Sequence, residues 1–98
     1  MNDKTTIEAT FSPLEQLLAE RKTTHGEYRD HANYTQVIKA VIHGSPNWDL
    51  MENHQRETLE MIAHKIGRIL AGDHSFDDHW KDISGYAKLT ADRLVGAA

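Results

Sequence analysis

The strongest constraint on the fold is the apolar pattern of residues 52–94. Between residues 59 and 70 the apolar residues recur at the i, i+3, i+4, i+7 spacing of an amphipathic helix; they are Leu59, Ile62, Ala63, Ile66, Ile69 and Leu70. A second helical stripe follows Gly72 and consists of Trp80, Ile83, Ala87, Ala91 and Leu94. Because the connection is short, the pattern predicts two antiparallel helices, residues 52–71 and 75–94, with their middles facing each other.

Two more helices are predicted in the first half of the chain, over residues 13–21 and 28–43. Ser12 supplies a cap hydroxyl and Pro13 suits the first helical position, while Gly44 suits the position after the second helix. Strand-like alternation of apolar and polar residues does not occur. We therefore expect an all-α fold, a compact four-helix bundle of residues 11–98 behind a flexible tail of residues 1–10.

Length and composition restrict the partners and the location. A chain of 98 residues has room for one modest core, and chains of this size often gain stability by oligomerising. The net charge of −4 argues against binding along a nucleic-acid polymer, and no apolar run approaches the ~20 residues that cross a membrane. The N-terminus lacks a signal-peptide pattern, so we expect a cytoplasmic protein.

The 52–71 helix carries a polar face opposite its apolar stripe. This face holds Glu57, Glu60, His64, Lys65 and Arg68. Two carboxylates three residues apart can converge on one cation such as Mg²⁺, and the two basic side chains suit phosphate groups. An ordinary exposed face with i,i+4 ion pairs explains the same pattern.

Two aspartates of the last helix add to this set. Asp82 lies at the edge of the apolar stripe, where a carboxylate needs a partner because unpaired burial is costly. A cation, Lys65 or Arg68 would serve, and a structural ion pair at the edge of the bundle is the alternative. Asp78 either contributes to the same site or forms a capping box with Ser75.

The segment His25-Gly26-Glu27-Tyr28 is a third candidate. The glycine permits an unusual backbone angle, and the histidine and tyrosine offer rings on which a base or a sugar could rest. A turn at the start of a helix with a core tyrosine is the alternative. Trp48 and Trp80 are interpreted as anchors of the core or of an interface.

These residues resemble a known family. Glu57-Thr-Leu-Glu60, followed by His79-Trp-Lys-Asp82, resembles the ExxE…ExxD signature of the MazG-like all-α nucleoside triphosphate pyrophosphohydrolases. Residues 60–70 and 78–87, together with His25-Gly26-x-Tyr28, are similar to small phage and prophage members that are associated with nucleotide modification. The resemblance covers about residues 18–94. It implies a homodimer or homotetramer, located in the host cytoplasm if the chain is phage-encoded.

The resemblance implies a Mg²⁺-dependent enzyme, with Mn²⁺ as the alternative ion, that converts a nucleoside triphosphate to a monophosphate and pyrophosphate. Glu57, Glu60 and Asp82 would be catalytic and would bind the metal together with Asp78. Residues expected to bind the nucleotide substrate are Lys65, Arg68, His25, Tyr28 and His64.

Two departures from the signature leave the activity open. His79 stands where the signature has glutamate, and Arg56 stands where a further glutamate is often found. The second hypothesis is therefore a phage protein that binds a nucleotide or a cyclic-nucleotide signal without catalysis, sequesters it and so counters host defence. A helical interaction module without a ligand is the third.

Overall fold

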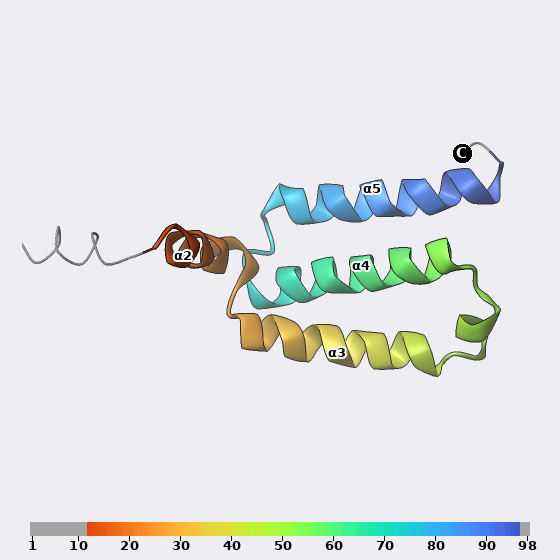
Figure 1. Ribbon diagram of the computed structural model, residues 1–98, viewed down its shortest axis with the longest axis horizontal. Coiled ribbons are helices and arrows are strands. Elements are labelled where there is room, and N and C mark those ends of the chain that lie inside the picture. The colour runs from red at the N-terminus through yellow and green to blue at the C-terminus, as the bar shows by residue number, and fades with distance from the viewer. Residues whose placement is uncertain (1–11, 97–98) are drawn as a thin grey trace, which may run out of the picture.

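The computed structural model describes residues 12–96, and all regular structure in this range is helical (Figure 1). The elements are α2 (Pro13–His25), α3 (Tyr28–Gly44), the short 3₁₀ helix η1 (Pro46–Leu50), α4 (Asn53–Ala71) and α5 (Asp77–Leu94). The all-α fold class is therefore confirmed. The tail expected at residues 1–10 lies outside the described residues.

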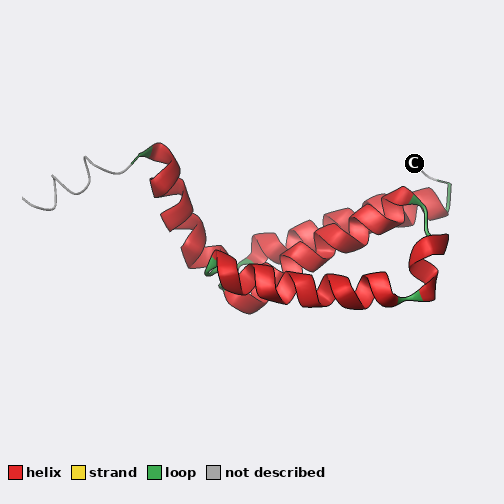
Figure 2. Cartoon of the chain, turned by 60° about the horizontal axis from the view of Figure 1, so that its bottom comes forward, coloured by secondary structure: helices red, strands yellow, loops and turns green. Residues whose placement is uncertain are grey.

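Helices α3, α4 and α5 lie side by side as one antiparallel layer with α4 in the middle (Figure 1). Helix α2 crosses the end of this layer and projects away from it (Figure 2). Helices α3 and α5 each pack against α4, which separates them (Figure 1). The four helices thus pack against one another as the sequence predicts, but in an open layer instead of a compact bundle.

The helix ends follow from local hydrogen bonds. The Glu15 N–H donates to Ser12 Oγ at 3.1 Å, which confirms the predicted cap of α2. Helix α2 runs to His25, beyond the predicted end near residue 21, and stops at Gly26, whose φ of 78° suits glycine. Helix α4 begins with a reciprocal capping box between Glu52 and Gln55.

The start of α5 differs from the expectation. The capping box expected between Ser75 and Asp78 is absent, because α5 begins two residues later, at Asp77, and has Phe76 as its N-cap residue. The Ser75 N–H instead donates to Asp73 Oδ1 at 2.9 Å and helps to form the turn before the helix. Asp78 is therefore free of the capping role that the sequence offered for it.

Helices α3 and α4 approach each other closely at Gly67. A Cβ atom at this position would meet Thr35 Oγ1 and would lie 2.8 Å from His31 Cδ2. Thr35 and His31 are buried by this contact, although neither Thr35 Oγ1 nor His31 Nε2 has a hydrogen-bond partner. Among residues 12–96, Ala63 is the one apolar side chain that is fully buried.

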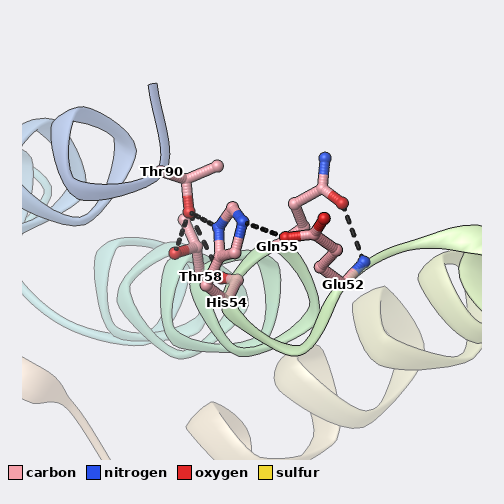
Figure 3. A network of polar contacts seen from close by, with 5 residues as sticks. All are labelled: Glu52, His54, Gln55, Thr58 and Thr90. Atoms are coloured by element: carbon pink, nitrogen blue, oxygen red, sulfur yellow. Dashed lines mark hydrogen bonds and ion pairs between the residues drawn. The ribbon is translucent and has the colours of Figure 1, made fainter. Parts of the chain in front are cut away.

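Helices α4 and α5 are joined by polar contacts along their length. Near one end, Thr90 Oγ1 lies 2.8 Å from Thr58 Oγ1 and 3.2 Å from His54 Nδ1, and His54 Nε2 lies 2.9 Å from a Glu52 carboxylate oxygen (Figure 3). Near the other end, Lys65 Nζ and Asp82 Oδ2 are 2.9 Å apart. These contacts confirm the antiparallel pairing predicted for the two segments.

The apolar stripes are only partly buried within one chain, whereas the sequence interpretation placed them in the core. In the α4 stripe Ala63 is buried and most of the other side chains are half-buried. Leu70 of α4 is 55% exposed, and Trp80 and Leu94 of α5 are 55% and 62% exposed. In the described part of the chain, no helix combines the length and apolar character required to cross a membrane.

Candidate functional site

Two hollows open where α2 and α4 end and α3 and α5 begin. One hollow, of about 430 Å³, is lined by Leu18, Arg21, Lys22, His25, Gly26, Glu27, Tyr28, His31 and Arg68. The other, of about 360 Å³, is lined by Arg21, His25, Lys65, Arg68, Phe76, Asp78, His79 and Asp82. Because they share Arg21, His25 and Arg68, we treat them as one site, the junction groove. Its two volumes lie within the size range of small-molecule sites.

The backbone around the groove is held by the carbonyl group of Thr24. This oxygen accepts a hydrogen bond from the Asp73 N–H at 3.0 Å and a second one from His79 Nε2, also at 3.0 Å. Gly26 and Gly72 allow this contact, since a Cβ atom at Gly26 would meet the Ala71 carbonyl group and one at Gly72 would meet that of Thr24. The end of α2 is thereby fixed against the loop between α4 and α5.

His79 is a structural residue of this junction. It is 1% exposed, and its ring meets those of His25 and Phe76 edge-on, with centroids 4.7 and 5.0 Å away. A carbonyl oxygen can only accept, so Nε2 must carry the proton that is donated to Thr24. The position at which the MazG-like signature has glutamate is therefore occupied here by a buried hydrogen-bond donor.

The charges of the groove are only partly paired. Lys22 pairs with Glu27 at 2.6 Å, and Lys65 pairs with Asp82 at 2.9 Å. The hydrogen bond from Lys65 and its charge hold the pKa of the Asp82 carboxyl below its usual range. Arg21 and Arg68 have no ion-pair partner among the carboxylates of residues 12–96. The groove therefore keeps two unpaired guanidinium groups in a chain of net charge −4.

The histidines of the groove are held neutral by their surroundings. Burial and then the charge of Arg68 lower the pKa of His25 to about 4. The same two causes, in the same order, lower the pKa of His31. At pH 7 these rings therefore offer flat, uncharged surfaces beside the arginines. The ring of Tyr28, which is 80% exposed, lies edge-on to that of His31 at 5.8 Å.

Most of the site residues proposed from the sequence meet in the groove. Those that line it are His25, Tyr28, Lys65, Arg68, Asp78 and Asp82. Asp82 pairs with Lys65, which is one of the three partners considered from the sequence. The groove lies at the end of the α4–α5 pair, and α2 and α3 complete it.

The other three proposed residues lie outside the groove. Glu57 is exposed, and Glu60 Oε1 lies 2.8 Å from His43 Nε2 of α3. The ring of His64 lies 5.8 Å from that of His31, and burial, followed by the charges of Lys39 and Arg68, lowers the pKa of His64. Within residues 12–96, no three side chains of the types that bind metals gather closely enough to hold an ion.

The sequence interpretation missed three polar residues of the groove, Arg21, Lys22 and His31, and two apolar ones, Leu18 and Phe76. Of the polar residues, Arg21 and Lys22 lie at the end of α2, and the predicted end of that helix near residue 21 gave no reason to place them beside Arg68. The signal available was the adjacent His25-Gly26 pair, because a left-handed glycine turns the chain sharply.

Comparison of the chain with protein-family models, curated proteins and solved structures found no match.

Proposed function

We propose that the junction groove binds a nucleotide or a nucleotide-derived phosphate ester and retains it without hydrolysis. The observation that carries the proposal is the position of Arg68, which lines both hollows and has no carboxylate partner among residues 12–96. A guanidinium group matches the planar, bidentate geometry of phosphate. An unpaired arginine in an acidic chain therefore favours an anionic ligand.

The two hollows suit the two parts of such a ligand. Leu18, His25 and Tyr28 give one hollow an apolar and aromatic lining, against which a base and its ribose could stack. Lys65 and Arg68 give the other hollow the cations for phosphate groups, and Arg21 is shared by both. A ligand with a ring system at one end and phosphates at the other would occupy the full groove.

Retention is favoured over hydrolysis by the positions of the carboxylates. Glu60 contacts His43 on α3, Glu57 is exposed, and Asp82 is paired with Lys65. As these side chains lie, they do not fit a resident Mg²⁺ ion, which prefers converging oxygen ligands. Pyrophosphohydrolysis stays a prediction of the resemblance, and sequestration of a nucleotide signal is the function that the groove supports better.

A nucleotide panel separates these two activities. Purified protein is incubated with ribonucleoside and deoxyribonucleoside triphosphates, monophosphates and cyclic nucleotides, in EDTA and in Mg²⁺. Retained ligand is measured by equilibrium dialysis and released pyrophosphate by a coupled assay. We expect at least one nucleotide to be retained intact in EDTA. Arg68→Ala should weaken its binding by about 10- to 100-fold, because a charge-assisted hydrogen bond is lost.

The control is Arg93→Ala, which removes an exposed arginine from the last turn of α5, far along the helix from the groove. This variant should bind as the wild type does. Turnover in Mg²⁺ that Glu60→Gln abolishes would show hydrolysis and refute retention. If both arginine variants lose binding, the loss reflects the net charge of the chain and not a contact made by Arg68. If no nucleotide binds, the proposed ligand class is refuted.

A further inference from the structure

One side of the three-helix layer is apolar and is only partly covered by the chain. On α4, Gly67 faces α3, whereas Thr58 and Lys65 face α5. At 100° per residue, these contacts leave two free sides on α4. One side holds Leu59, Ile62, Ile66 and Leu70, and the other holds Glu57, Met61, His64 and Arg68. The groove residue Arg68 and the apolar row therefore lie on opposite sides of the layer.

The neighbouring helices continue the apolar side. Because α3 and α5 run antiparallel to α4, the same periodicity places Tyr34 and Val41 of α3, and Trp80 and Leu94 of α5, on this side. They are 46%, 74%, 55% and 62% exposed, respectively. We call this surface the apolar face; it consists of the apolar row of α4 and these four side chains.

We propose that a second copy of this chain covers the apolar face, so that two three-helix layers pack back to back with their junction grooves on opposite outer surfaces. The first reason is the missing core. With Ala63 as the one fully buried apolar side chain of residues 12–96, a single chain leaves much apolar surface in water and has little burial to offset the entropy of folding. Covering the apolar face would supply the missing burial.

The second reason is the area of the face. Helices of 17, 19 and 18 residues are about 25–28 Å long at 1.5 Å per residue. Three of them at a spacing of about 9 Å span about 27 Å in width. The footprint is therefore about 700 Å² per copy, close to the ~800 Å² that each partner buries in a stable protein–protein interface.

The third reason is self-complementarity. A two-fold interface brings the same patch of both copies together, so any charge on the patch would meet itself. The central row of the face on α4 contains no charged residue, and the acidic and basic side chains of this helix lie at its edges or on the opposite side. An apolar face of this kind can pack against its own copy without like-charge repulsion.

The test uses a pair of matched substitutions of exposed apolar residues by glutamate. Val41→Glu changes the apolar face at a side chain that is 74% exposed in the single chain, so the fold of one chain is not directly disturbed. Leu89→Glu is the control, since Leu89 is 62% exposed on α5 but lies on the same side as Asp82 and the groove. Molar mass is measured by sedimentation equilibrium over a range of protein concentrations, and helicity by circular dichroism.

We expect the wild type and Leu89→Glu to sediment as two chains or a multiple of two. Val41→Glu should raise the dissociation constant by at least ~100-fold, because two carboxylates would be buried without partners. The melting temperature of the wild type should also rise with protein concentration. A folded wild-type monomer with a concentration-independent melting temperature would overturn the proposal. An assembly that Leu89→Glu dissociates and Val41→Glu leaves intact would place the interface on the other side. Neither result bears on nucleotide binding, which dialysis measures independently.

Discussion

Replacement of His79 tests whether this buried side chain stabilises the junction between α2 and the loop that joins α4 to α5. In His79→Ala the hydrogen bond to the Thr24 carbonyl group is lost, which removes about 1 kcal/mol. Thr24 keeps its bond from the Asp73 N–H, so the carbonyl oxygen is not left without a partner. The ring is 1% exposed, so its removal also leaves a cavity, which adds about 2 kcal/mol. We expect His79→Ala to lower the free energy of unfolding by about 3 kcal/mol.

The matched variant is His79→Gln, whose side-chain amide can still donate to Thr24. It loses the edge-on ring contacts with His25 and Phe76, so the expected cost is about 1 kcal/mol. Urea denaturation followed by circular dichroism measures both variants, at one protein concentration because assembly affects apparent stability. If His79→Ala is as stable as the wild type, or if His79→Gln is no better than His79→Ala, then His79 does not hold the junction by this bond.

Substitutions at Gly67, His25 and Glu57 test three other features of the chain. Gly67→Ala should lower stability by about 1–3 kcal/mol in urea denaturation, since its methyl group would overlap Thr35 and His31. The pKa of His25 is lowered to about 4 in the folded chain, so on acidification the unfolded chain takes up a proton first. The free energy of unfolding should therefore fall between pH 6.5 and pH 4, and His25→Gln should flatten this decline. Glu57→Gln should leave nucleotide affinity unchanged in dialysis, whereas a fall would favour the carboxylate site of the resemblance.

The helices and their order were predictable because their ends are marked locally. Ser12 and Pro13 begin α2, and Gly72 separates α4 from α5. The short connection after Gly72 makes the two helices antiparallel, and this pairing brings Asp82 to Lys65. The sequence therefore contained the elements and one of the central contacts of the site.

The path of α2 and the role of position 79 could not be predicted. Whether Arg21 meets Arg68 depends on the angle of the chain at Gly26, which the residue type permits but does not determine. A histidine in a helix can equally be a ligand, a donor or a solvated side chain. The bond to Thr24, 55 residues away, is what makes His79 structural.

The sequence also could not show that the helices form an open layer instead of a compact bundle. An apolar stripe such as that of α4 shows that side chains avoid water, but not which surface covers them. The stripes of α4 and α5 were assigned to a core within one chain, whereas the structure leaves most of the α4 stripe half-buried and most of the α5 stripe exposed.

The histidines provide the most direct test of the claim that the junction groove is the ligand site. Four of them, at positions 25, 31, 43 and 54, have imidazole signals that nuclear magnetic resonance can follow while the most tightly retained nucleotide is added in EDTA. His25 and His31 line the groove, whereas His43 contacts Glu60 and His54 contacts Thr90. We predict that the signals of His25 and His31 shift in proportion to ligand occupancy while those of His43 and His54 stay in place. Shifts confined to His43 or His54 would contradict the assignment of the site.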